Sequence, residues 1–597
     1  MARKKRRNRH QDTPEIEATE SVTRRLPADP VPTAPTAAEK LITGDMIYRP
    51  IGGNNPDDIG ANTGIVEFNR YGGGKGKKTS RIMIDNGVKF ADPDSRYDSL
   101  MVDTSNYFQD RDSGNHPSEM VDAIVLTHAH EDHIGAICHD MNRGKVLPPI
   151  YATPLTQAFV EQSFIRRGFK DPKSWPQFNT MEAGKAIQIG DINIMPIPVS
   201  HSVSQSMALA ITTPTGSMMH SGDYKADATL PIGQIFEKEQ TEELCRKALA
   251  RYGHERFDVA TVDSTRAYMP GSTPTEGKVK SEMDKIVKES NGHRVVTAVM
   301  GRSTERIINM AKVAAENDRT LVVHGKSIIL SLQALARADQ ISRGIEARAP
   351  KGKGKRSSNA PAYDMSEISD ILTRYVGRKV RILEGRDEAV DNIPESKQMV
   401  LATGTQGEQN AALPMAAMGN HKTLLLGSND VVVRSASIIP GNEAPIGAMD
   451  SAVRSQGVAR LVTTEEAMVH SSGHGYSEDV DQYLESTKAR TVIPVHGSVE
   501  LMEKNAERIA TRAQELDLKL EKMRNGDRVV IGQDVIVTPT KEPARFLGIR
   551  NTVEDPVARM WKQDYVYEPV DENGKALGPA PKAPANDRKP TLGKRAG

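Results

Sequence analysis

The sequence predicts a globular α/β chain with at least two domains. Short apolar runs typical of buried strands alternate with segments of helical periodicity, and they outnumber the clear hairpin signals. With 597 residues, the chain is too long for a single compact core. Its 37% apolar and 26% charged residues are the composition of a globular protein that carries additional polar segments.

Seven apolar runs are expected to form strands, and one segment near the C-terminus is expected to form a helix. In chain order, the strands are expected at residues 124–126, 192–199, 259–262, 295–299, 321–323, 424–426 and 492–495. Pro196 and Pro198 lack the backbone N–H of a strand ladder, which restricts the second run to a sheet edge or a strand end. The helix is expected within residues 502–516, where apolar side chains recur every three or four positions.

Three polar segments are predicted to lie outside the folded domains. Residues 1–40 combine a cluster of arginines and lysines with acidic and Pro/Ala/Thr-rich stretches, which is typical of a disordered basic arm. Residues 350–358 indicate an exposed basic loop. Residues 541–597 are predicted to be a C-terminal extension that is largely disordered.

The composition excludes several classes of protein. The 79 Lys and Arg against 78 Asp and Glu leave a net charge of +1, which excludes a uniformly basic nucleic-acid wrapper but not local basic patches. With only Cys138 and Cys245, a disulfide framework and a Cys-rich zinc module are both excluded, and a reducing, cytoplasmic location is expected. No apolar run approaches the roughly 18 residues of a membrane span, and no apolar segment of a secretory signal follows the basic N-terminus.

A cluster of metal-ligand residue types follows the expected strand at 124–126. His128, His130, Asp132 and His133 stand in the segment His-Ala-His-Glu-Asp-His, here called the metal-binding loop. Side chains on a turn at a strand end can diverge onto two adjacent ions, and imidazole with carboxylate suits zinc, manganese or iron. The alternative is a solvated histidine-rich loop, but the position after a strand is the context that metal binding requires.

Further ligand candidates stand at the ends of other strands. His201, Asp223 and His496 each follow an apolar stretch, and Asp85 ends the run 81–84. Because α/β enzymes build their sites at the carboxyl ends of successive strands, we expect these side chains to meet the metal-binding loop.

The metal-binding loop and the later ligand candidates together resemble the metallo-β-lactamase superfamily. The resemblance implies an αββα sandwich with two divalent metal ions, zinc in the first place and manganese as the alternative. The implied ligands are His128, His130 and His201 for the first ion, Asp132, His133 and His496 for the second, and Asp223 as the bridge. Asp85 matches the superfamily's first motif, which supports the ligand loop from behind.

The long interval between Asp223 and His496 is predicted to be an inserted domain, because it has strands and helices of its own. Its markers resemble the β-CASP nucleases, and ribonuclease J most closely. They are Asp263-Ser264-Thr265, Thr403-Gly404-Thr405-Gln406-Gly407-Glu408, the segment 437–443 and His470-Ser471-Ser472-Gly473-His474. The three β-CASP motif positions fall on Asp263, His474 and His496, and a histidine at the third favours RNA-processing members over the DNA-repair branch.

The resemblance implies a division of the chain into five parts. A disordered basic arm is expected at 1–40, the metallo-β-lactamase domain at 41–263 and 463–540, the inserted β-CASP domain at 264–462, and the extension at 541–597. One departure from the family stands in the inserted domain, where Met300-Gly301-Arg302-Ser303 replaces a segment that usually reads close to Phe-Ala-Ser-Asn.

The implied chemistry is hydrolysis of a phosphodiester by a metal-activated hydroxide. Asp132 and Asp263 are expected to take part in catalysis, and His474 is our candidate general acid, the alternative being a phosphate ligand or a packed histidine. Gly404, Gly407, His470 and Ser472 are candidates for cradling phosphates, although Gly-rich turns are commonly only turns.

The leading interpretation is therefore a metal-dependent ribonuclease of the ribonuclease J type. It would act on single-stranded RNA as an endonuclease, a 5′-to-3′ exonuclease or both, in RNA processing and decay. The protein is not expected to bind a membrane. A homo-oligomer is possible, and the sequence identifies no protein partner. The alternatives are a DNA nuclease or small-ester hydrolase on the same scaffold and, less favoured, a non-catalytic RNA-binding subunit, since pseudo-enzymes lose ligands and all of them are present here.

Overall fold

The computed structural model describes residues 42–71, 78–91, 95–114, 116–233, 235–346, 363–532, 534–540, 544–552 and 565–577. The predicted basic arm at 1–40, the predicted basic loop at 350–358 and the last residues of the extension, 578–597, lie outside the described residues. Among the helices of the described part, none is both long and apolar enough to cross a membrane.

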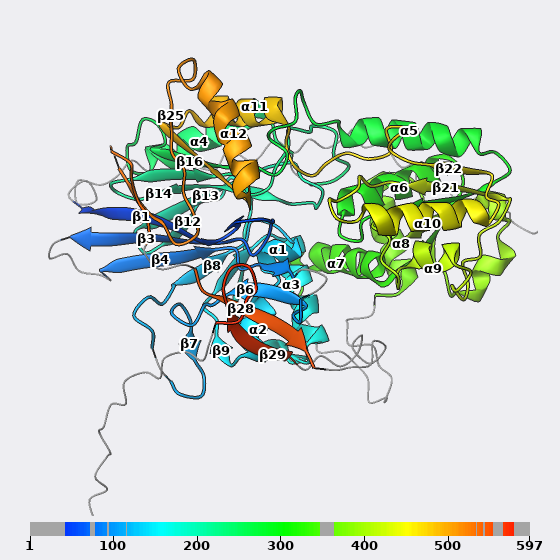
Figure 1. The fold of residues 1–597 in the computed structure, drawn as a ribbon, viewed down its shortest axis with the longest axis horizontal. Helices are drawn as coiled ribbons and strands as arrows, with labels where there is room; N and C mark the ends of the chain where they lie inside the picture. The colour runs from blue at the N-terminus through cyan, green and yellow to red at the C-terminus, as the bar shows by residue number, and fades with distance from the viewer. Residues whose placement is uncertain are drawn as a thin grey trace, which may run out of the picture. The chain divides into compact units, whose positions relative to one another are not determined.

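Two sheets pack face to face, as the αββα prediction requires (Figure 1). In spatial order, the first contains β11 (Phe178–Thr180), β10 (Ile150–Ala152), β8 (Ala123–Val125), β4 (Thr79–Ile84), β3 (Thr63–Tyr71), β1 (Thr43–Gly52), β26 (Arg528–Ile531) and β27 (Ile536–Thr538). The second contains β12 (Ile187–Ile189), β13 (Ile192–Pro198), β14 (Met207–Thr212), β15 (Ser217–His220), β16 (Val259–Asp263), β23 (Thr491–Val495) and β25 (Lys519–Leu520).

Apolar side chains of both sheets form one buried core between them. Phe68 and Ile82 of the first sheet and Leu209 and Ile493 of the second belong to this core, and none of the four is exposed. Helices cover the outer faces of the sandwich (Figure 1). These are α3 (Pro154–Arg166) on the first sheet, and α4 (Lys238–Ala250), α11 (Ser477–Thr487) and α12 (Val499–Arg512) on the second.

A third, six-stranded sheet belongs to the inserted segment, and its paired strands all run parallel. Its spatial order is β19 (Ile382–Glu384), β18 (Thr320–His324), β20 (Gln398–Ala402), β17 (Arg294–Ala298), β21 (Asp430–Arg434) and β22 (Arg460–Val462). Around it lie α5 (Glu276–Glu289), α6 (Thr304–Glu316), α7 (Lys326–Ser342), α8 (Met365–Val376), α9 (Ala412–Ala417) and α10 (Glu443–Ser455). Buried clusters on both faces of this sheet show that helices cover each side, as parallel sheets require.

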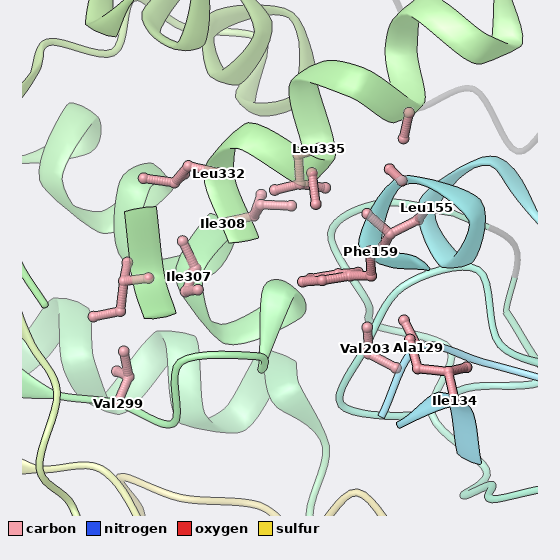
Figure 2. Close-up of a cluster of buried hydrophobic side chains, with 14 of the residues drawn as sticks. Ala129, Ile134, Leu155, Phe159, Val203, Val299, Ile307, Ile308, Leu332 and Leu335 are labelled. Carbon is pink, nitrogen blue, oxygen red and sulfur yellow. The ribbon is translucent and has the colours of Figure 1, made fainter. Parts of the chain in front are cut away.

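The sandwich and the inserted domain share a continuous apolar core. Figure 2 shows Phe159 and Leu155 of α3 facing Ile308 of α6 and Leu335 of α7, and all four belong to one buried cluster. Helices α3 and α7 make an extensive contact. The inserted domain is therefore packed directly against the outer helical layer of the first sheet.

The prediction of a strand at 424–426 is wrong. Leu424 and Leu426 are buried in the core of the inserted domain, but no ladder forms there, and Leu425 is 64% exposed. The carbonyl oxygen of Leu425 accepts instead from the Arg294 side chain at 2.5 Å. The run leads into a turn in which the Asp430 N–H donates to the Gly427 carbonyl, so the strand, β21, begins only at Asp430.

Two other predicted elements differ in detail from the structure. The helix expected within 502–516 is α12, which begins earlier and ends at Arg512. The strand expected at 192–199 is β13, which has a neighbour on each side and ends at Pro198, so the strand-end alternative holds. Strand β12 pairs only with Ile192–Ile194, so Pro196 and Pro198 face a strand on one side alone, as their missing N–H groups require.

The C-terminal extension contributes two strands to the sandwich domain. β28 (Phe546–Asn551) pairs with β29 (Tyr565–Val570) and with β6 (Ser99–Val102), which in turn pairs with β5 (Val88–Phe90). Leu547 and Ile549 are buried with Val88, Met101 and Ala136. Part of the segment that we predicted to be largely disordered is thus an ordered layer beside the metal-binding loop, since α1 (Glu131–Ile134) contacts β5.

Candidate metal centre

The metal-binding loop is anchored where two parallel strands end together. β4 and β8 are parallel neighbours, which brings Asp85, just after β4, beside Thr127, just after β8. The Asp85 carboxylate accepts from the Thr127 N–H and from its hydroxyl, each at 2.8 Å. Asp85 adopts a left-handed backbone with φ 57°, and its Oδ2 lies 2.7 Å from His133 Nδ1. Asp85 thus contacts the metal-binding loop from behind, and its supporting role stays a prediction.

Four of the predicted ligands meet in a first group: His128, His130, His201 and Asp223. His130 Nδ1 lies 3.2 Å from His128 Nε2 and 3.0 Å from His201 Nε2. Asp223 Oδ2 lies 3.4 Å from His128 Nε2 and 3.8 Å from His201 Nε2. Nitrogen ligands about 2.0–2.1 Å from a tetrahedral zinc stand about 3.3 Å from one another, so these spacings suit such an ion.

The second group holds Asp132, His133, Asp223 and His496. His133 Nε2 and His496 Nε2 are 3.4 Å apart and lie 3.2 and 3.3 Å from Asp223 Oδ1. Asp132 Oδ2 lies 3.5 Å from His133 Nε2 and 3.4 Å from His496 Nε2. The two groups share Asp223 through different oxygens, which is the arrangement of a bridging carboxylate.

The ring nitrogens that face away from the two groups have protein partners. The Nδ1 atoms of His201 and His496 lie 2.6 Å from the Gly473 carbonyl oxygen and 2.7 Å from the Thr265 hydroxyl. His128 Nδ1 lies 3.0 Å from the Thr127 hydroxyl. Such partners fix the tautomer and ring orientation of a ligating histidine. His130 differs, since among the described residues its outer nitrogen has only the Ser202 hydroxyl as a partner, at 3.4 Å.

The electrostatics of the site suit a divalent cation. Burial opposes ionisation of Asp223, but His133, His496 and His128 lower its pKa well below the ordinary value. Burial lowers the pKa of His133, yet Asp223, Asp132 and Asp85 raise it to about 10. Asp223 Oδ1 is buried without a hydrogen bond. A dication is the species that such an inward-facing set of carboxylates and imidazoles accommodates.

The Asp263–His474 pair lies beside the second group. His474 Nδ1 is 2.7 Å from Asp263 Oδ2, its ring stacks on His496 at 5.5 Å, and its side chain is 21% exposed. Burial lowers the pKa of His474, but the carboxylates of Asp263 and Asp223 outweigh this and raise it. A raised pKa keeps more of the imidazole protonated near neutral pH, which a general acid needs.

The other residues predicted to bind phosphate have identifiable surroundings within the protein. Their binding of phosphate stays a prediction. The Ser472 hydroxyl accepts from the His474 N–H at 3.0 Å and so shapes that turn. Burial and the nearby Arg306 lower the pKa of His470 to about 3, which leaves its ring neutral. Gly404 and Gly407 have φ of 109° and 77°, and a Cβ would meet Pro414 and Pro445 respectively.

Sequence reasoning did not identify several residues at the site. The Asn62 side-chain amide donates to Asp132 Oδ2 at 3.1 Å and lies 3.0 Å from His133 Nε2. Thr265 orients His496, and Gly473 orients His201 through its backbone carbonyl. Thr265 and Gly473 lie inside segments that the resemblance had marked, whereas nothing in the local sequence distinguishes Asn62.

Comparisons with known proteins relate three segments of the chain to known families. Three family models match: a β-lactamase superfamily domain at residues 97–243, the β-CASP domain of ribonuclease J at 374–451, and a Zn-dependent metallo-hydrolase RNA specificity domain at 462–518. The crystal structure of a protein of unknown function from Enterococcus faecalis V583 shares the fold, with a TM-score of 0.51 and 16% identity, covering 82% of this chain and 100% of that one.

Curated relatives are similar over most of the chain. A ribonuclease J of Sinorhizobium meliloti is 28% identical over 469 residues, which make up 78% of this chain and 71% of the relative. A ribonuclease J of Helicobacter pylori strain J99 is 28% identical over 486 residues, 81% of this chain and 60% of the relative. One of Mycobacterium tuberculosis strain H37Rv is 27% identical over 473 residues, 79% of this chain and 72% of the relative.

Proposed function

We propose, from the membership of this chain in the ribonuclease J-like β-CASP group of the metallo-β-lactamase superfamily, that it is a metal-dependent ribonuclease. The observation that carries the proposal is the convergence of all seven predicted ligands on two groups that share Asp223. The RNA specificity model matches residues 462–518, the segment that supplies His496 to the second group and His474 beside it. That combination favours RNA over a small ester as the substrate.

The site is proposed to hold two divalent ions, zinc first and manganese as the alternative. When bound, such a pair supplies a water of lowered pKa and neutralises charge on a phosphate. Asp223 is proposed to bridge the two positions, and the histidines to present fixed nitrogens to them. His474 is proposed to donate a proton from its exposed edge to the leaving 3′-oxygen, with Asp263 holding its Nδ1.

His474→Ala is expected to lower kcat on single-stranded RNA by about 10²–10⁴-fold, because a positioned general acid contributes that much. Bound zinc, measured by mass spectrometry, should stay at the wild-type level. His474 also belongs to a third group with Asp223, Asp263 and His496 that has the composition of a metal site. Loss of zinc in parallel with activity would therefore identify His474 as a ligand and contradict the general-acid role.

The substrate class is tested by incubating the protein in parallel with a single-stranded RNA, a single-stranded DNA of the same length and a β-lactam. Each incubation is run once with zinc and once with manganese. We expect cleavage of the RNA, abolished by a chelator and restored by added metal. Comparable cleavage of DNA would favour the DNA-nuclease alternative, and turnover of the lactam alone would overturn the proposal. RNA carrying a 5′ monophosphate or triphosphate, with products read at both ends, separates endonucleolytic from 5′-to-3′ exonucleolytic cleavage.

A further inference from the structure

The Arg302 side chain connects the inserted domain to the metal-binding loop. It stands in the turn between β17 and α6, and its Nη1 donates to the Ala129 carbonyl oxygen at 2.5 Å. Its Nη2 forms an ion pair with Glu131. The guanidinium lies 4.8 Å from the centre of the Phe159 ring, the side chain that Figure 2 shows directed from α3 toward α6 and α7. Arg302 thus contacts the residues on both sides of His130, Ala129 and Glu131.

Among the histidines proposed as ligands, His130 is the one whose ring is held least firmly by a hydrogen-bond partner. The other four histidines of the two groups have a partner on the outward nitrogen at 2.6–3.0 Å. In the part of the chain that the structure describes, the outward nitrogen of His130 has only the Ser202 hydroxyl, at 3.4 Å. His130 is also the N-cap of α1, and its side chain does not cap that helix. The position of its Nδ1 therefore depends on how firmly the neighbouring backbone is held.

We propose that Arg302 is a positioning residue for the first metal site, acting through the backbone at Ala129 and the carboxylate of Glu131. The inference rests on the proposed function only in requiring that the site binds metal. The Arg302 guanidinium lies over the Phe159 ring, and the 21% exposure of Arg302 leaves its bonds to the loop partly shielded from water. A side chain of the inserted domain would then set the affinity of an ion held by the sandwich domain.

The test compares zinc affinities of full-length variants by competition with a chelator, which needs no RNA. Arg302→Met keeps apolar packing on Phe159 but removes every donor. It is expected to release one of the two zinc equivalents at about 10–100-fold lower chelator concentration, the usual cost of losing a residue that orients a ligand. Arg302→Lys, which retains the charge and a single donor group, should fall between Arg302→Met and wild type. Arg381→Ala, which breaks an exposed pair with Asp318 in the same domain, is the matched control and should titrate as wild type.

A second substitution separates positioning from general loss of structure. Glu131→Gln should weaken the same zinc equivalent, and the double variant should lose little more than Arg302→Met alone, because both act on one interaction. If Arg302→Met fails to fold, Glu131→Gln carries the test. Zinc titrations of the variants that match wild type would overturn the proposal. A raised KM for RNA with unchanged zinc affinity would in addition assign Arg302 to RNA binding. Absence of RNA cleavage by the zinc-loaded wild type would instead refute the proposed function.

Discussion

Asp223→Asn is expected to lower kcat on RNA by about 10³-fold, equivalent to about 4 kcal/mol of barrier, because it removes the shared charge of both ion positions. Asp223 is the one side chain common to all three groups of metal-ligand residues in the described part of the chain. Its two oxygens face different histidines, Oδ2 toward His128 and Oδ1 toward His133 and His496. Asparagine keeps the shape of the side chain but offers only one oxygen, so both positions weaken together.

The measurement pairs kcat with zinc content at a fixed free zinc concentration. Both should fall in Asp223→Asn, whereas only kcat should fall in His474→Ala. Asp318→Asn, at a side chain that is 75% exposed, is the control for loss of one carboxylate and should match wild type in both readouts. An Asp223→Asn enzyme that keeps its zinc and a kcat within tenfold of wild type would refute the bridging role.

Arg306→Ala is expected to lower the free energy of unfolding by about 3–5 kcal/mol, the cost of leaving a buried charge without its partner. Arg306 and Glu276 are 3% and 1% exposed, and their two hydrogen bonds measure 2.8 and 2.7 Å. Arg306 also donates to the Ser435 hydroxyl and to the Val469 carbonyl. The network therefore joins α5, α6 and the end of β21 to the chain entering the His470–His474 segment.

The size of this effect is checked by urea denaturation, with a compensated variant as the control. Arg306→Met combined with Glu276→Gln removes both charges and should recover part of the loss, since replacing a whole buried pair is often nearly neutral. Lys225, whose Nζ lies 3.8 Å from Glu276 Oε1, keeps other partners in this variant, because its Nζ also lies 3.2 Å from Asp227 and donates to the Ser471 hydroxyl at 2.9 Å. Equal stability of Arg306→Ala and wild type would show that the pair contributes nothing net.

The fold class and the convergence of the candidate ligands were predictable because their signals are local or recur in a known family. The spacing of the metal-binding loop after β8 is local, and the resemblance supplied Asp223 and His496. The strand at 424–426 was mispredicted because periodicity cannot distinguish a strand from an apolar segment that a side chain such as Arg294 holds in place.

Partners brought together only by the tertiary fold left no signal in the sequence. Asn62 contacts Asp132, which lies 70 positions away in the sequence. Arg302 contacts Glu131, which lies 171 positions away. β28 and β29 lie in a segment whose polar composition indicated disorder, yet they are ordered because β6 offers an edge with which to pair. The role of Asp85 could be inferred only from the family motif, although its contact with Thr127 follows from the parallel pairing of β4 and β8.

The separation of 363 residues between His133 and His496 has a consequence during synthesis of the chain. At about 5–20 residues per second, a ribosome needs roughly 20–70 s to travel from one to the other. The side chains of the first group, His128, His130, His201 and Asp223, are therefore made long before His496 completes the second group. An ion bound by the second group can therefore enter only after residue 496 has been synthesised.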